Sequence, residues 1–81
     1  MRLVTDQANR CVIAIDAGTT GVRSRAVFPD GRPAVASYRE FAQRYPQPGW
    51  VEHDASEIWL AARATLGEVI EQVQPATVAA I

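Results

Sequence analysis

The chain has 81 residues, 48% of them hydrophobic and 21% charged, and its formal net charge is -1 at pH 7. This length allows one small domain at most, and the nearly balanced charge excludes the strongly basic surface by which proteins bind nucleic acid or an anionic membrane. Because all eight basic residues are arginines, the chain also lacks the lysine of a Walker-type phosphate-binding loop.

Residues 1–10 hold polar and charged side chains in place of the apolar core of a signal peptide. We expect a flexible tail there, followed by a domain over residues 11–81. Cys11 is the only cysteine, so no internal disulfide can form, and its place in an apolar run predicts a buried, unreactive thiol. These features favour a cytoplasmic protein, and no stretch has the roughly 20 apolar residues that span a bilayer.

Residues 12–15 are apolar and mostly β-branched, which predicts a buried strand that ends at Asp16. A turn of two threonines flanked by Gly18 and Gly21 follows. Glycines let the backbone amides of a turn approach an anion closely, and the threonines add two hydroxyl groups. The sequence therefore predicts an anion-binding turn with a carboxylate beside it.

Two more strands are predicted over residues 22–28 and 33–41, joined by a reverse turn at residues 29–32, where Asp-Gly tolerates positive φ. Alternation along residues 22–28 places Arg23 and Arg25 on one face, with small and apolar side chains on the other. We therefore expect three consecutive antiparallel strands, with the arginine face able to reach past the first turn.

Residues 43–53 contain two prolines and a glycine close together, which predicts an irregular but ordered loop. We expect Tyr45 and Trp50 to anchor this loop by packing. His53 has no second histidine or cysteine at ligand spacing, so we assign it a structural role and no metal.

A helix is predicted from Asp54 to Pro75, with Asp54 and Glu57 forming a capping box at its start. Its apolar stripe is expected to pack on the sheet, and it comprises Ile58, Trp59, Ala62, Leu66, Val69, Ile70 and Val73. Residues 78–81 then begin a further strand. Because a domain rarely stops inside a strand, we expect the chain to be a fragment.

Two segments together carry a family resemblance. Residues 16–20 followed by Arg23 resemble the first phosphate-binding loop of the FGGY carbohydrate kinases, which belong to the actin-like, ribonuclease-H-like ATPase superfamily. Residues 45–54, followed by Glu57, Ile58 and Trp59, resemble the corresponding stretch of the glycerol kinases in that family. The resemblance covers residues 11–81 and implies an incomplete α/β domain: a three-stranded antiparallel start of the ATPase sheet, one crossover helix and the start of a further strand.

The resemblance also implies a function for the full-length parent, namely ATP-dependent phosphorylation of a polyol or sugar, with glycerol as the first candidate. It places Asp16 near Mg²⁺, directly or through a water. The residues expected around the phosphates of ATP are Gly18, Thr19, Thr20, Gly21 and Arg23. The general base and the polyol site would lie beyond this chain, which alone would be inactive, and the parent could form a homo-oligomer.

Other interpretations stay open. Asp16 and the threonines could be ordinary turn residues, and the loop departs from that of glycerol kinases at Gly21 and Val22, where two serines are common, and at Ala17. The chain could instead be a truncated, inactive remnant or a stand-alone phosphate-binding module. Another actin-like ATPase would share the loop but not the segment at residues 45–54. The length of the reading frame past Ile81 distinguishes a kinase from a remnant.

Overall fold

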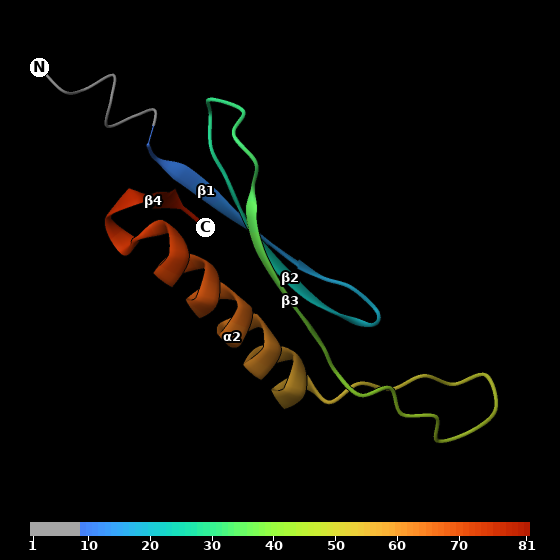
Figure 1. Cartoon of the computed structure of the whole chain (residues 1–81). Coiled ribbons are helices and arrows are strands. Elements are labelled where there is room, and N and C mark those ends of the chain that lie inside the picture. Colours follow the sequence, from blue (N-terminus) through green and yellow to red (C-terminus); the bar gives the residue numbers. More distant parts are fainter. Residues whose placement is uncertain (1–8) are drawn as a thin grey trace, which may run out of the picture.

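The structure, a computed structural model, describes residues 9–81, so most of the predicted tail (residues 1–10) lies outside the described residues. Figure 1 shows a sheet with one long helix laid along it. In chain order the elements are β1 (Cys11–Ala17), β2 (Gly21–Val27), β3 (Val35–Glu40), α2 (Ala55–Val73), a 3-10 turn η1 (Pro75–Thr77) and β4 (Val78–Ala80).

The sheet has the strand order β3-β2-β1-β4. β1 and β2 pair antiparallel, as do β2 and β3, whereas β4 joins the free edge of β1 in parallel. A parallel neighbour requires a crossover connection, and α2 provides it. The predicted α/β class, with three antiparallel strands, a crossover helix and the start of a further strand, is confirmed. The domain limits at residues 11–81 stay a prediction.

The core lies between one face of the sheet and α2, which packs mainly against β2 and β3. Its buried side chains come from both ends of the chain and comprise Cys11, Ile13, Ala26, Phe28, Val69 and Val73. As predicted, the Cys11 thiol is buried. The layer between β2 and α2 also contains a polar pair, because the fully buried hydroxyls of Ser24 and Thr65 lie 2.9 Å apart.

The opposite face of the sheet is open in the part of the chain that the structure describes. Arg23 and Arg25 are exposed on it while Ser24 and Ala26 are buried on the helix side, which confirms the predicted alternation along β2. Val12, at the far end of the face, is 51% exposed. This face therefore offers apolar side chains at one end of β1 and charged side chains at the other.

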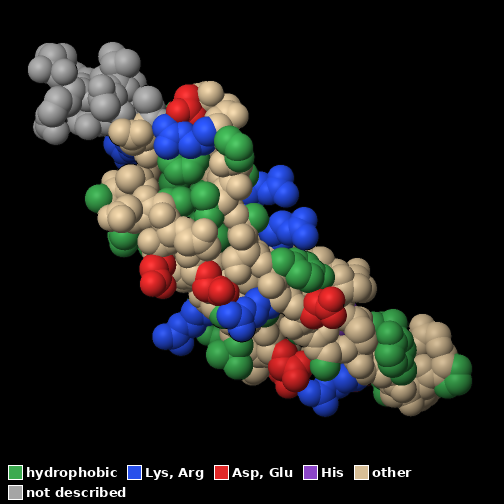
Figure 2. All heavy atoms as spheres, viewed as in Figure 1, with side chains coloured by type: hydrophobic (Ala, Val, Ile, Leu, Met, Phe, Trp, Pro, Cys, Tyr) green, Lys and Arg blue, Asp and Glu red, His purple; other side chains and the backbone are tan. Residues whose placement is uncertain are grey.

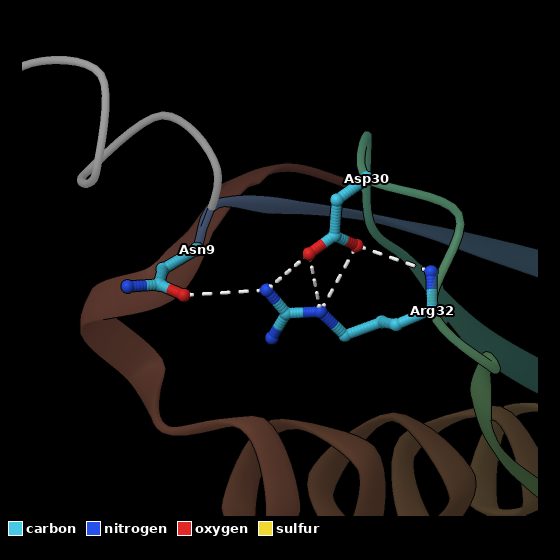
Figure 3. Close-up of polar contacts among 3 residues, drawn as sticks. All are labelled: Asn9, Asp30 and Arg32. Carbon is cyan, nitrogen blue, oxygen red and sulfur yellow. Dashed lines mark hydrogen bonds and ion pairs between the residues drawn. The ribbon is translucent and has the colours of Figure 1, made fainter.

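The reverse turn between β2 and β3 is confirmed, with Gly31 at φ +79°. Asp30 accepts hydrogen bonds from the Arg32 guanidinium, with the shortest at 2.6 Å, and these bonds lower the pKa of the Asp30 carboxyl. Figure 3 shows the Arg32 guanidinium between Asp30 and Asn9, to which it donates over 3.3 Å. Arg32 also lies over the Phe28 ring, 4.4 Å from its centroid, so its guanidinium contacts Asp30, Asn9 and Phe28 together.

An ion pair and a hydrogen bond tie the helix to β3. Arg39 donates to the Glu68 carboxylate over 2.9 Å, and Ser37 donates to the same oxygen over 3.0 Å. Both bonds lower the pKa of Glu68, the Arg39 bond most strongly. On the face shown in Figure 2, basic and acidic side chains are interspersed along the molecule. The Arg39–Glu68 pair thus fixes α2 against β3.

The prediction that Tyr45 and Trp50 anchor the loop by packing is wrong. Tyr45 is 69% exposed and Trp50 55% exposed, because the loop projects beyond the sheet (Figure 1) and no described layer covers its rings. The loop is closed instead by paired backbone hydrogen bonds between Arg44 and Glu52, 2.9 and 2.7 Å long. At its base the rings of Phe41 and His53 meet edge to face, with centroids 4.9 Å apart.

The start of α2 also differs from the capping-box prediction. Asp54 is the N-cap, but its carboxylate accepts from the amide of Ser56 over 2.8 Å and not from that of Glu57. The short aspartate side chain is satisfied one residue earlier, at the second helical position, which serves as well as the third. The Glu57 carboxylate lies 3.6 Å from the Arg44 guanidinium instead.

The predicted apolar stripe of α2 is confirmed in its second half, at Leu66, Val69, Ile70 and Val73, and differs in its first half. The residues buried against the sheet are Ala61, Thr65, Val69 and Val73, which recur every four positions. Trp59, placed in the stripe from the sequence, is 63% exposed. Small side chains face the sheet here because α2 approaches β2 closely enough for Thr65 to contact Ser24, which leaves no room for an indole.

Candidate functional site

The candidate site is the turn between β1 and β2, which the sequence pointed to. The amide of Gly18 donates to the carbonyl of Gly21 over 2.9 Å and closes the turn. Asp16 was expected at the end of its strand. It lies inside β1, one residue before the end, because the pairing with β2 continues to Ala17. Thr19 and Thr20 form the exposed tip.

Asp16 and Arg23 are directly opposite each other in the β1–β2 register. Residues opposite each other in an antiparallel pair project to the same face, so both belong to the open face of the sheet. The Arg23 guanidinium lies 5.1 Å from the centroid of the Tyr38 ring, a cation–π contact. Within residues 9–81, neither Asp16 nor Arg23 takes part in an ion pair. Both charges therefore remain available to a ligand.

Gly21 is required for space and not for conformational freedom. In the described residues only Gly31 and Gly49 have glycine φ in the positive range, so neither Gly18 nor Gly21 uses the freedom expected of it. A Cβ at Gly21 would lie 2.5 Å from the Arg39 carbonyl oxygen and 2.6 Å from the Tyr38 hydroxyl. The backbone of β2 thus approaches β3 closely at this position, where no side chain fits.

The two carbonyls at the tip of the turn are held from within the protein. The Thr19 carbonyl accepts from the side-chain amide of Gln43 over 2.7 Å, and the Thr20 carbonyl accepts from the backbone amide of Phe41 over 3.2 Å. The Thr20 hydroxyl lies 3.2 Å from that of Tyr38. In the described part of the chain the amides of Thr19 and Thr20 have no acceptor. Two donors therefore remain at the exposed tip, just beyond the paired Asp16 and Arg23.

The residues of this turn fit a magnesium ion only as part of a phosphate complex. Among residues 9–81 there is no group of three or more histidine, cysteine, aspartate or glutamate side chains able to hold a metal, and the carboxylates nearest the turn are Asp16 and Glu40, which is opposite Gly21. Mg²⁺ is usually held by one or two carboxylates together with substrate phosphates and waters, and seldom by an all-protein cage. Exposed Asp16 beside free amides matches the first arrangement.

Two residues of the site were not found from the sequence. Tyr38 is opposite Arg23 in the β2–β3 register, a pairing that the predicted turn at residues 29–32 already implies. Gln43 gives no such signal, because it lies in the irregular segment after β3 and reaches the turn across 24 positions of sequence. His53, expected to be structural, contacts Gln43 and Phe41.

A search of the described helices for a segment of membrane-spanning length and hydropathy finds none.

Comparison with known proteins yields one family match. Residues 11–81 match the N-terminal domain of the FGGY family of carbohydrate kinases. The match starts at the first residue of β1 and includes every described strand, the helix and the turn at Thr19 and Thr20.

Several similar curated proteins carry the name glycerol kinase. That of Aquifex aeolicus is 52% identical over 62 residues, which is 76% of this chain and 13% of the relative. That of Shewanella pealeana is 49% identical over 63 residues, 78% of this chain and 13% of the relative. That of Synechocystis is 40% identical over 80 residues, 96% of this chain and 16% of the relative. The chain thus spans less than a fifth of the length of these relatives.

Proposed function

We propose a function from one premise: the chain belongs to the FGGY family of carbohydrate kinases. The protein that contains it transfers the terminal phosphoryl group of ATP to a hydroxyl of a polyol or sugar, and glycerol is the first acceptor to test. Relatives at 40 to 52% identity are named glycerol kinases, which supports this acceptor. The observation that carries the proposal is the β1–β2 turn, which has two unpaired amides at its tip and Asp16 opposite Arg23 at its base.

Each residue of the turn has a task in this proposal. The amides of Thr19 and Thr20 and the Thr19 hydroxyl donate to phosphate oxygens, as backbone donors do in other anion sites. Arg23 neutralises phosphate charge from the open face, and Gly18 and Gly21 keep the turn tight. Asp16 holds Mg²⁺, directly or through a water; when bound there, the ion supplies charge neutralisation at the transferring phosphoryl group.

The 81 residues alone would be inactive under this proposal. Phosphoryl transfer also needs a pocket for the acceptor and a residue that accepts its proton. The carboxylates near the turn are Asp16, which is assigned to the ion, and Glu40, opposite Gly21, and the resemblance to the glycerol kinases implies that the general base lies much further along the chain. We therefore propose that the base and the acceptor pocket belong to the remainder of the protein.

A second candidate is a phosphate-binding module without catalysis. It would need only the exposed amides of Thr19 and Thr20 and the charge of Arg23, which the described residues already hold. Sequencing past the codon for Ile81 separates the two candidates. A frame that continues for several hundred codons supports the kinase, and a stop codon directly after Ile81 supports the module.

The kinase proposal is tested by expressing the complete reading frame and measuring ATP-dependent phosphorylation of glycerol and of a panel of other polyols and sugars. Asp16→Ala should lower kcat about a hundredfold or more, the scale on which a lost electrostatic group costs a transition state. The KM for the acceptor should change little. Asp30→Ala is the matched control, because it removes a carboxylate from the turn at the other end of β2.

Two results would contradict the proposal. Near-normal turnover of Asp16→Ala at saturating magnesium and ATP would show that the turn is not the phosphate site. A complete, folded protein that phosphorylates none of the acceptors would favour the non-catalytic module.

A further inference from the structure

Gln43 lies just after β3 and joins the candidate turn to the loop at residues 43–53. Its side-chain nitrogen donates to the Thr19 carbonyl over 2.7 Å and to the Phe41 carbonyl over 3.4 Å. Its side-chain oxygen lies 2.7 Å from Nε2 of His53. The side chain is half-buried: its bonds to Phe41 and His53 are partly shielded from water, whereas its bond to Thr19 is exposed.

The contacts fix the orientation of the Gln43 amide and place a hydrogen on Nε2 of His53. Two carbonyls face one end of the Gln43 amide, so that end must be the NH₂ group, since the oxygen would be repelled there. The oxygen then faces His53, and Nε2 of the imidazole must carry a hydrogen in order to donate to it. The His53 ring is held in turn by its edge contact with Phe41. Gln43 is therefore oriented by its neighbours before any ligand binds.

Holding the Thr19 carbonyl also orients the next amide. The peptide group is planar and, as in all described peptide bonds, not cis, so the carbonyl of Thr19 and the N–H of Thr20 point in opposite directions. With the carbonyl directed at Gln43, the Thr20 N–H is directed away from it. A second bond, from the Phe41 amide to the Thr20 carbonyl, fixes the following peptide group in the same way. The tip of the turn is thus aimed by the segment that follows β3.

We propose that Gln43 is a positioning residue for the nucleotide: its hydrogen bond to the Thr19 carbonyl aims the Thr20 amide at a phosphate group of ATP. This inference rests on the proposed function of the turn. His53 acts one step further back, by donating to the Gln43 oxygen and preventing the amide from rotating. Without the Gln43 bond the Thr19–Thr20 peptide can rotate, and binding must then fix it, which weakens affinity for ATP.

The test uses the complete protein and the substitution Gln43→Met, which keeps the length of the side chain and removes its hydrogen bonds. We expect the KM for ATP to rise about three- to tenfold, the range that corresponds to one lost hydrogen bond, with the KM for the acceptor unchanged. Gln72→Met is the matched control, because Gln72 is exposed on α2, away from the turn. It should leave both constants unchanged.

A second variant separates the two bonds of Gln43. Gln43→Glu can still accept from His53 but cannot donate to the Thr19 carbonyl, so it should raise the KM for ATP at least as much as Gln43→Met. Hydrogen exchange supplies a readout that does not depend on activity. The amides of Gly18 and Phe41, which are bonded to Gly21 and Thr20, should exchange faster in both variants than in the wild type.

The outcomes separate this inference from the function on which it rests. An unchanged KM for ATP in both Gln43 variants, with a normally active wild type, would overturn the inference alone. Exchange at Gly18 and Phe41 that matches the wild type would also overturn it, because the turn would then be held without Gln43. A folded wild type with no affinity for ATP would overturn the proposed function itself.

Discussion

Replacement of Gly21 by alanine is expected to destabilise the chain strongly, although it adds a single methyl group. The new Cβ would lie 2.5 Å from the Arg39 carbonyl oxygen, whereas ordinary contacts begin at 3.4 Å. The two strands would have to separate by about 0.9 Å at this point. Because Arg39 contributes backbone, which cannot turn aside like the end of a side chain, β2 and β3 must part or Gly21 must shift.

The size of the loss follows from two contributions. Overpacking of a tight site costs about 1–3 kcal/mol, and each ladder hydrogen bond that is weakened near Gly21 adds about 1 kcal/mol. We expect the free energy of unfolding to fall by about 2–4 kcal/mol, which changes the folding equilibrium roughly 30- to 1,000-fold. For a chain of this size, such a loss exceeds what most single substitutions cost.

Gly67→Ala is the matched control for the same chemical change. Gly67 lies inside α2, and a Cβ there meets nothing within 4 Å. Alanine in a helix interior is favoured over glycine by about 0.5–1 kcal/mol, so this variant should be more stable than the wild type. Urea titration of the three proteins, followed by far-UV circular dichroism, measures both changes. A Gly21→Ala variant within about 0.5 kcal/mol of the wild type, the range of an ordinary surface substitution, would refute the close approach of β2 and β3.

Three further predictions concern the core and the helix. Thr65→Val should lower the free energy of unfolding by about 1–3 kcal/mol, because it leaves the buried Ser24 hydroxyl without its partner, and Ser24→Ala should lower it by about 1 kcal/mol. In a double-mutant cycle measured by urea titration, the loss in the double variant should be smaller than the sum of the two single losses. The hydrogen bond from Arg39 lowers the pKa of Glu68 in the folded state. Glu68 therefore stabilises the fold fully above the ordinary pKa of glutamate, and this contribution is lost as the pH falls through the lowered pKa. In Glu68→Gln, the free energy of unfolding measured against pH should no longer show this acid-side decline. The Cys11 thiol, 1% exposed, should react with a maleimide only as fast as the chain opens, and labelling as rapid as that of a free thiol would contradict its burial.

Features that depend on neighbouring residues could be predicted from the sequence. The alternation of Arg23 and Ser24 reports which face of β2 is buried, because successive side chains of a strand point to opposite sides. The turn at Gly31 and the start of α2 at Asp54 follow from backbone preferences of single residues. The family resemblance also lay in continuous stretches of sequence, and the match over residues 11–81 confirms it.

Features that depend on packing between distant segments could not be predicted in this way. Trp50 and Trp59 are large apolar residues of the kind that commonly pack in a core, yet both are exposed because no described layer covers the surfaces on which they lie. Asp16, Thr19 and Arg23 were identified from a local motif, but the motif does not say what holds the turn in place. Gln43 holds it across 24 positions, and such a contact leaves no periodic pattern.

The sequence by itself thus determined the strands, the helix and the residues of the candidate turn, because each depends on short-range periodicity or on the preferences of one residue. Only the tertiary structure decided that a Cβ at Gly21 would meet the backbone of Arg39, and that Gln43 directs the Thr19 carbonyl. These contacts arise because the β2–β3 pairing brings the segment after β3 back beside the first turn, and a side chain there meets partners that its sequence neighbours do not specify.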